Sequence, residues 1–123
     1  MSKTVLTIDD SRTMREMLNY ALVEAGYKVL QAVDGVEGLE VLQAKGDEID
    51  VVITDINMPR MDGFGVIEGV RADPNHRATP ILVLTTESDA AKKERARSAG
   101  ATGWIVKPFS PVKLVEAVRR VAA

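Results

Sequence analysis

Five short apolar runs alternate with five segments of helical periodicity along the chain, and no low-complexity linker interrupts them. Each apolar run is too short for a helix and is rich in Val, Ile and Leu, which favours a buried β-strand. We predict strands over residues 5–8, 29–33, 51–54, 81–84 and 104–106. We predict helices over residues 11–25, 36–44, 64–72, 89–99 and 111–121. The chain therefore repeats one strand–helix unit five times.

A chain of repeated strand–helix units is restricted to few architectures. Parallel pairing of the strands, with right-handed crossovers, gives a doubly wound sheet with helices on both faces. Five units are too few to close a barrel, which needs eight, so the sheet stays open. We therefore predict an α/β fold, a (βα)5 doubly wound, five-stranded parallel sheet, formed as a single domain by residues 1–123.

Composition excludes several classes of function. The chain has no cysteine and one histidine, which removes disulfides, Fe–S clusters and thiolate zinc sites and disfavours a Ser-His-Asp triad. The formal net charge of −2 argues against a nucleic-acid-binding surface. The start, MSKTVLTIDD, is no signal peptide, and no apolar stretch approaches the roughly 20 residues that cross a bilayer. We expect a cytoplasmic protein with no nucleic-acid partner and no membrane insertion, in which His76 is a solvated loop residue.

Polar side chains stand at the ends of the predicted strands. In open parallel sheets, sites lie beyond the carboxyl ends of the strands. These ends carry Asp9 and Asp10, Asp55, Thr85 and Thr86, and Lys107. Carboxylates that are brought together repel one another unless cations intervene, and Lys107 supplies only one positive charge. The remaining negative charge suits Mg²⁺, which binds oxygen ligands and needs few carboxylates.

This set of groups predicts phosphorylation of an aspartate. A carboxylate beside Mg²⁺ and a lysine can attack phosphorus, because the cations neutralise charge on the phosphoryl oxygens. Thr85 can donate a hydrogen bond to the newly attached group. The alternative is that these residues only cap helices, as Ser11 and Asp89 are placed to do. Acid at two strand ends together with a lysine at a third is difficult to explain by capping alone.

Four segments carry a resemblance to a known family: IDDSRTMR, ITDINMPRMDGF, ILVLTTES and SAGATGWIVKPFS. In this order and at this spacing, they resemble the receiver domain of bacterial two-component response regulators, and most closely its single-domain chemotaxis regulators of the CheY type. The resemblance covers the whole chain. It implies a flavodoxin-like (CheY-like) fold with strand order 2-1-3-4-5, no output domain, and a monomer.

The resemblance also implies roles for the residues at the strand ends. Asp55 is the implied phospho-acceptor, with Thr85 as the switch hydroxyl and Lys107 as the charge partner of the phosphoryl group. The implied Mg²⁺ ligands are Asp9, Asp10, Asp55 and the carbonyl of Asn57. Asn57 and Glu87 would position the water that hydrolyses the acyl phosphate.

Three features close to this site bear on how it switches. Trp104 occupies the position of the Tyr or Phe that turns inward in this family, and its larger ring affects how far it can turn. Ile56 stands beside the acceptor, where well-studied chemotaxis members have an aromatic residue. The Lys107–Pro108 bond is expected to be cis, as in the family.

The implied function is that of a signalling protein that acts enzymatically only on itself. It would take a phosphoryl group onto Asp55 from a CheA-like histidine kinase or a histidine phosphotransfer protein. It would then present its fourth helix, fifth strand and fifth helix to a target such as the flagellar motor switch, and finally dephosphorylate itself. The fourth helix has mainly Ala90, Ala96 and Ala99 to bury, so we expect it to be weakly anchored.

Three other functions are alternatives to this one. The closest is a phosphate sink, or a shuttle to a histidine phosphotransfer protein, without motor binding. A cofactor protein of the flavodoxin type would need a hydroxyl- or glycine-rich phosphate loop after the first strand, and TIDDSR is acidic there. An unphosphorylated interaction module would be expected to lack one of the acids or the lysine, and all are present.

Overall fold

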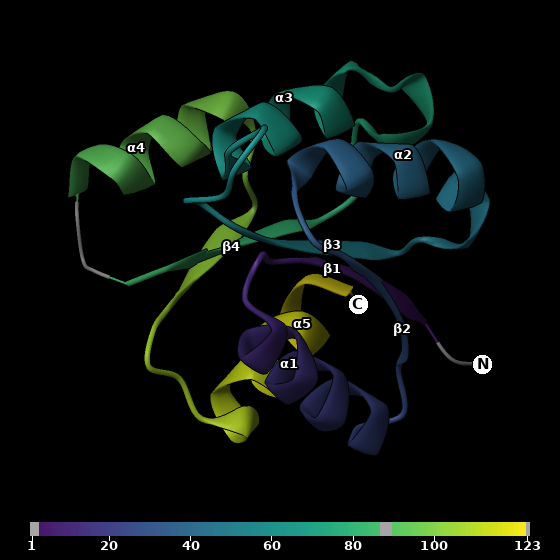
Figure 1. Cartoon of the computed structure of the whole chain (residues 1–123), viewed down its shortest axis with the longest axis vertical. Coiled ribbons are helices and arrows are strands. Elements are labelled where there is room, and N and C mark those ends of the chain that lie inside the picture. Colours follow the sequence, from purple (N-terminus) through teal and green to yellow (C-terminus); the bar gives the residue numbers. More distant parts are fainter. Residues whose placement is uncertain (1–2, 87–89, 123) are drawn as a thin grey trace.

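The computed structural model describes residues 3–86 and 90–122, and strands alternate with helices throughout (Figure 1). The strands are β1 (Thr4–Ile8), β2 (Lys28–Ala32), β3 (Val51–Asp55), β4 (Ile81–Thr85) and β5 (Gly103–Val106). The α-helices are α1 (Arg12–Glu24), α2 (Gly35–Lys45), α3 (Gly63–Ala72), α4 (Ala90–Ala99) and α5 (Pro111–Ala122). Two short 3-10 helices, η1 (Gly46–Glu48) and η2 (Pro74–His76), precede β3 and β4. All ten predicted elements are confirmed; the predicted start of the fourth helix at residue 89 lies outside the described residues, and no other bound is displaced by more than one residue.

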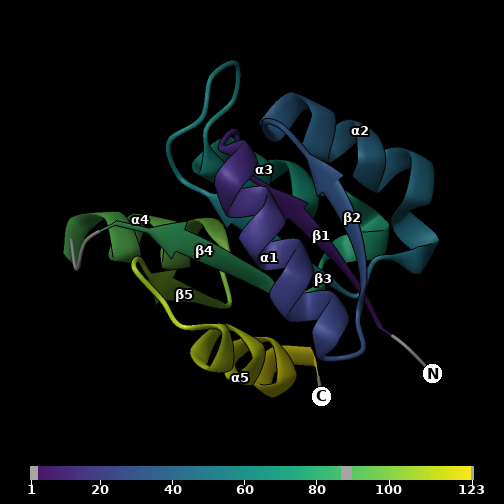
Figure 2. The same ribbon diagram turned by 60° about the horizontal axis from the view of Figure 1, so that its bottom comes forward.

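The strands form one parallel sheet in the order β2-β1-β3-β4-β5, which confirms the predicted topology. In the register of the sheet, Ile8 pairs with Thr54, and Thr85 pairs with Val106. The carboxyl ends of β1, β3, β4 and β5 therefore meet at one edge. Helices α2, α3 and α4 cover one face of the sheet, and α1 and α5 cover the other (Figures 1 and 2).

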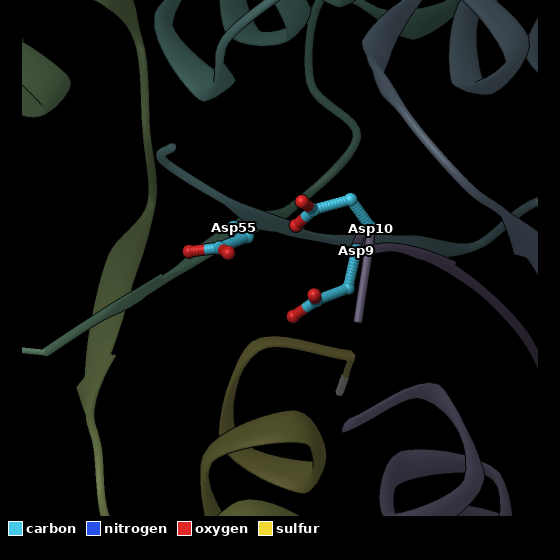
Figure 3. A group of neighbouring side chains, drawn as sticks. All are labelled: Asp9, Asp10 and Asp55. Carbon is cyan, nitrogen blue, oxygen red and sulfur yellow. The ribbon is translucent and has the colours of Figure 1, made fainter. Parts of the chain in front are cut away.

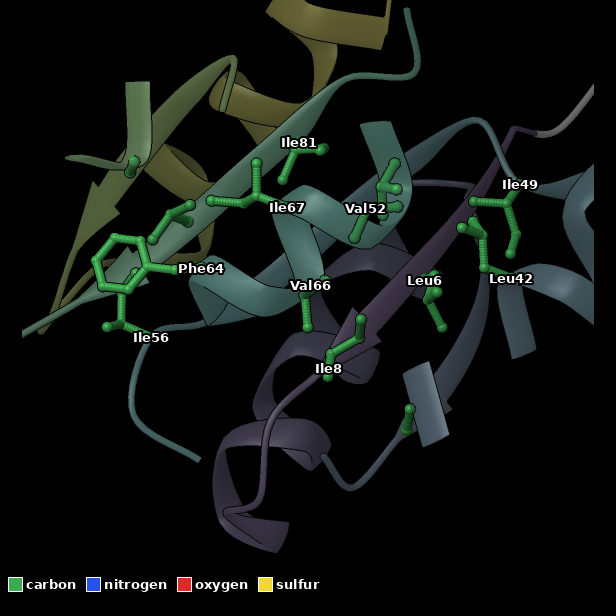
Figure 4. Packing of buried hydrophobic residues seen from close by; sticks show 14 residues of the cluster. Leu6, Ile8, Leu42, Ile49, Val52, Ile56, Phe64, Val66, Ile67 and Ile81 are labelled. Carbon is green, nitrogen blue, oxygen red and sulfur yellow. The ribbon is translucent and has the colours of Figure 1, made fainter. Parts of the chain in front are cut away.

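The central strands send alternate side chains into two apolar layers. Leu6 and Val52 lie on the side of α2 and α3, in one apolar cluster with side chains such as Ile67 (Figure 4). Val5 and Ile53 pack on the side of α1 and α5. All five are fully buried. Because both faces are covered, these strands are apolar at successive positions rather than at every second one, and the ends of the strands are held rigidly.

Helix α4 is weakly attached to this core, as the sequence predicts. Ala96 is its one fully buried residue among those described. Two long cationic side chains add contacts: the Arg95 guanidinium lies 4.0 Å from the centroid of the Phe64 ring, and the Lys93 ammonium lies 5.2 Å from that of Trp104. Such contacts contribute little at an exposed site, so α4 can shift at low cost. Within the described residues, no helix has the length and apolar character required to cross a membrane.

His76 is buried, which corrects the expectation of a solvated loop residue. Its side chain belongs to a residue that is only 3% exposed, and its Nδ1 lies 2.8 Å from Oγ1 of Thr79. Helix η2 places the imidazole against η1, where a Cβ added at Gly46 would lie 2.7 Å from Nε2. The surrounding sequence is polar, and the burial comes from a distant segment that local composition does not reveal.

Arg71 joins two loops at the amino-terminal edge of the sheet. Its Nε and Nη2 donate to the carbonyl of Gly100, at 3.0 and 2.8 Å. Its Nη1 donates to the carbonyls of His76 and Thr79, at 2.9 and 2.7 Å. Burial lowers the pKa of the guanidinium. One side chain of α3 therefore holds the segment before β4 and the segment before β5 in place.

Candidate functional site

Three carboxylates lie together at the carboxyl edge of the sheet. Asp9 and Asp10 follow β1, and Asp55 is the last residue of the neighbouring strand β3. One carboxylate oxygen from each lies within 4.8 Å of the others (Figure 3). The arrangement follows from the fold, because adjacent parallel strands bring their carboxyl ends to the same place.

Asp9 is the most deeply buried of the three. It is fully buried, and its Oδ1 accepts a hydrogen bond from the Ser11 amide at 2.8 Å, while Oδ2 has no hydrogen-bond partner among the described residues. Burial raises the pKa of Asp9, and so do the charges of Asp55 and Asp10, while the Ser11 amide and Lys107 oppose the rise. A buried carboxylate oxygen without a hydrogen bond is unfavourable unless a cation binds it. Three carboxylates around such an oxygen fit Mg²⁺.

Lys107 places a positive charge beside two of these carboxylates. Its Nζ lies 3.5 Å from Oδ2 of Asp55 and 3.7 Å from Oδ2 of Asp9, and only 16% of its side chain is exposed. Its backbone amide donates to the carbonyl of Thr85 at 2.6 Å, which extends the pairing of β4 with β5. The Lys107–Pro108 peptide bond is cis, as predicted. The lysine is thus held from its backbone and points at both acidic strand ends.

The other predicted site residues lie around Asp55. Oδ1 of Asp55 accepts a hydrogen bond from the Ile56 amide at 2.8 Å, which fixes the orientation of the carboxylate. Asn57 is exposed in the loop that leads to α3. Thr85 is buried at the end of β4. Glu87 lies outside the described residues, as does the expected helix cap Asp89, whereas the expected cap of α1 is observed: the Ser11 hydroxyl accepts from the Met14 amide.

Trp104 lies at the surface beside a small cavity. Its residue is 37% exposed, and its ring faces the Lys93 ammonium. The cavity has a volume of about 10 Å³, and its lining includes Ile56, Val83, Thr85 and Trp104 itself. This is room for one water molecule and not for an indole. An inward turn of Trp104 therefore requires the lining side chains to move first.

Two basic contacts at this edge were not predicted from the sequence. Nη1 of Arg15 donates to the carbonyl of Asp9 at 2.7 Å. The guanidinium of Arg60 donates to both carboxylate oxygens of Asp34, at 2.7 and 3.0 Å. The first contact spans less than two helical turns. The second joins positions that are 26 residues apart, for which the sequence carries no periodic signal.

Replacing Asp9 by asparagine is expected to raise the midpoint of thermal unfolding of the metal-free protein at about pH 7. Because the pKa of Asp9 is raised on folding, the stability of the protein falls as the pH rises from the ordinary aspartate range through this raised pKa. Asparagine removes that penalty and still accepts from the Ser11 amide. Calorimetric scans in EDTA measure the midpoint, and the advantage should disappear at about pH 3, where the aspartates of both states are protonated.

Asp62→Asn is the matched control for this prediction. Asp62 is the exposed cap of α3, and asparagine caps a helix equally well, so its midpoint should not change. An Asp9→Asn midpoint at or below that of the parent protein at about pH 7 would contradict the assignment of Asp9 as a destabilising buried charge.

Several proteins of known identity are similar to this chain in sequence and in fold. The chain is 44% identical over 113 residues to chemotaxis protein CheY1 of Helicobacter pylori, covering 91% of this chain and 90% of that protein. It is 41% identical to a CheY homologue of Campylobacter jejuni, with 91% and 86% covered. The structure of chemotaxis protein CheY4 of Vibrio cholerae superposes with a TM-score of 0.93 at 44% identity, covering 98% of this chain and 99% of that one. A response regulator of Chloroflexus aurantiacus also gives a TM-score of 0.93, at 35% identity.

The match to a family model agrees with these relatives. Residues 5–119 match the response regulator receiver domain, which is nearly the whole chain. The matched range includes the acidic residues at the ends of β1 and β3 and the lysine after β5. The chain therefore belongs to the response regulator receiver domain family, as a signalling domain of the CheY type.

Proposed function

We propose that this protein receives a phosphoryl group on Asp55 in a two-component chemotaxis system. The observation that carries the proposal is the position of Asp55: a central-strand carboxylate with the Lys107 ammonium 3.5 Å away and two further carboxylates beside it. A carboxylate oxygen of Asp55 would form the bond to phosphorus while the bond from phosphorus to the nitrogen of a donor histidine breaks. The product is an acyl phosphate on the end of β3.

The chain's own residues prepare this transfer. Mg²⁺ would be held by Asp9, Asp10, Asp55 and the Asn57 carbonyl. When bound, it would neutralise negative charge on the phosphoryl oxygens. Lys107, with its ammonium 3.5 Å from Oδ2 of Asp55, would contribute a second positive charge, and the Ile56 amide holds the Asp55 carboxylate in one orientation. Asn57, together with Glu87, would position the water that later hydrolyses the acyl phosphate.

The proposed output is a change at the surface of α4, β5 and α5. Helix α4 buries little, so a rearrangement at Thr85 can shift it without disrupting the core. A CheA-like histidine kinase or a histidine phosphotransfer protein would supply the phosphoryl group to a cytoplasmic, monomeric protein. The flagellar motor switch is the proposed target, because the relatives at 41–44% identity are chemotaxis proteins. A phosphate sink or shuttle would use the same site without this target.

Incubation with acetyl phosphate tests the chemistry. In Mg²⁺ the intact mass of the protein should increase by one phosphoryl group, and EDTA should prevent the increase. The reason is that, without Mg²⁺, the three carboxylates repel an incoming phosphate. Equal uptake with and without divalent metal would overturn the proposal.

Trp104 should report the switch. Beryllofluoride with Mg²⁺, which stands in for the phosphoryl group, should shift the tryptophan emission, because new acceptor oxygens at Asp55 draw Thr85 toward the site and enlarge the space beside the indole. Mg²⁺ alone should change the emission little, since Ile56 beside the acceptor is not aromatic. Thr85→Ala should weaken the response to beryllofluoride. If beryllofluoride binds and both the emission and the near-UV dichroism stay constant, Trp104 is not a switch residue.

A further inference from the structure

The loop between β3 and α3 carries Asn57 and has an unusual backbone conformation. Arg60 has a φ of 66°, in the left-handed region that side chains other than glycine and asparagine rarely adopt. Around it, the Met61 amide donates to the carbonyl of Pro59 at 2.7 Å, which closes a three-residue turn. Such a conformation persists where the surrounding structure imposes it, so we expect the contacts of Arg60 to stabilise it.

The Arg60 side chain is fixed by Asp34. Its Nε donates to Oδ2 at 2.7 Å, and its Nη2 donates to Oδ1 at 3.0 Å. Only 7% of the Asp34 side chain is exposed, whereas 57% of the Arg60 side chain is, so the pair is shielded from solvent on the carboxylate side and is held by two parallel hydrogen bonds. The hydrogen bond from Arg60 is the main cause of a lowered pKa at Asp34. A lysine could supply the charge but not the planar pair of donors.

Asp34 has more contacts than a helix cap requires. Its Oδ1 accepts from the Glu37 amide at 2.9 Å and so caps α2, a task that asparagine or serine performs equally well. Among the described residues, Arg60 is the cationic side chain paired with this carboxylate. A second contact lies beside the pair: a Cβ added at Gly35 would lie 2.8 Å from the Cβ and carbonyl of Met61, so the loop packs directly on the first turn of α2.

These contacts connect the loop to the strand that carries the acid pair. Asp34 follows β2, β2 pairs with β1 along its whole length, and the Asp9 amide donates to the carbonyl of Ala32 at 3.1 Å. The expected ligands of Mg²⁺ come from two neighbouring strands: Asp9 and Asp10 follow β1, and Asp55 and Asn57 lie at the end of β3 and in the loop after it. The ion pair between Arg60 and Asp34 adds a direct link from that loop to the segment after β2.

We propose that Arg60 is a positioning residue for the metal site: through Asp34 it holds the Asn57 segment at the distance from Asp9 and Asp10 that Mg²⁺ binding requires. The inference rests on the proposed function, since it assumes that this edge binds Mg²⁺. Arg60 itself does not contact the metal or the phosphoryl group. Its effect is on the affinity for Mg²⁺, and through it on phosphorylation at low Mg²⁺ concentration.

Calorimetric titration of the unphosphorylated protein with MgCl₂ is the test. Arg60→Asn removes the guanidinium and tolerates the left-handed φ, so the turn is preserved, and it should weaken Mg²⁺ binding about fivefold, less than the loss typical of a direct partner of a ligand. Arg60→Lys should recover part of the affinity. Arg77→Ala removes the same charge from an exposed position at the opposite edge of the sheet and should bind Mg²⁺ like the parent protein. Phosphorylation from acetyl phosphate should slow in Arg60→Asn at low Mg²⁺ and recover at saturating Mg²⁺.

The partner residue gives a second arm. Asp34→Asn keeps the cap of α2 and should weaken Mg²⁺ binding to a similar extent, and the double variant should be no weaker than either single one. In the metal-free Arg60→Asn protein, the amides of Met61 and Gly63, which donate within the loop, should exchange with solvent faster while amides of β1 are unchanged.

The outcomes separate this inference from the proposed function. If the parent protein binds no Mg²⁺, the proposed function fails. If the parent binds Mg²⁺ and Arg60→Asn binds it equally well with an intact circular dichroism spectrum, the role of Arg60 is refuted. Additive losses in the double variant, or a slowing that saturating Mg²⁺ does not correct, would also refute it.

Discussion

Asp55→Asn is expected to take up no phosphate from acetyl phosphate. The substitution conserves the shape of the side chain and an oxygen that can accept from the Ile56 amide, but it removes the nucleophilic carboxylate. Removing one negative charge from the cluster with Asp9 and Asp10 also relieves repulsion, so the variant should remain folded and its thermal midpoint should not fall. Loss of uptake then reports loss of the acceptor and not loss of the fold.

Intact mass spectrometry after incubation with acetyl phosphate and Mg²⁺ gives the measurement. Asp62→Asn is the control, because it makes the same chemical change seven residues further along the chain at an exposed helix cap, and it should be phosphorylated like the parent protein. Residual uptake by Asp55→Asn at the parent level would assign the acceptor to another carboxylate and overturn the proposed chemistry.

Arg71→Ala is expected to lower the free energy of unfolding more than any other substitution named here. It removes four hydrogen bonds to three backbone carbonyls, those of His76, Thr79 and Gly100, in two separate loops. Carbonyls left without donors in a partly buried place, together with the lost packing, should lower the free energy of unfolding by about 3 kcal/mol. For a domain of this size the thermal midpoint should fall by roughly 10 °C.

Urea denaturation followed by circular dichroism measures this loss. Arg97→Ala is the control: its ion pair with Glu94 is exposed, and its removal should cost less than about 0.5 kcal/mol. Arg71→Lys should behave nearly as badly as alanine, because one ammonium group cannot reach carbonyls in both loops. A loss below about 1 kcal/mol for Arg71→Ala would show that the loops are held by other contacts.

The sequence predicts the fold well because its signals are local. The period of the apolar residues distinguishes strands from helices, and in each helix it also shows which side of the helix packs on the sheet. The residues at the strand ends follow in turn, since parallel strands bring their carboxyl ends together. Asp9, Asp10, Asp55, Thr85 and Lys107 could therefore be placed at one edge before their distances were known.

The features that were missed depend on single side chains that cross between elements. The burial of His76 depends on η1, and the pair of Arg60 with Asp34 spans 26 residues. Arg71 donates a hydrogen bond to the carbonyl of Gly100, which is 29 residues away in the sequence. None of these contacts repeats with a period, and the residues would be unremarkable on the surface of another protein. Their partners are specified by the assembled tertiary structure alone.

Because α4 is weakly anchored, a protein that binds at α4 can in turn affect the carboxylate edge. Because Ala96 is its one fully buried residue among those described, burial of apolar surface opposes a shift of the helix only weakly. If phosphorylation shifts α4 as proposed, thermodynamic linkage makes the coupling reciprocal. A ligand that prefers the shifted position of α4 then favours the phosphoryl group at the carboxylate edge by the same factor by which the phosphoryl group favours that ligand. A modest binding energy is then enough to shift the helix, since about 1.4 kcal/mol of preference for one position changes the ratio of the two populations tenfold. A protein that binds this face would therefore also act as an effector of the site at the opposite end of the switch.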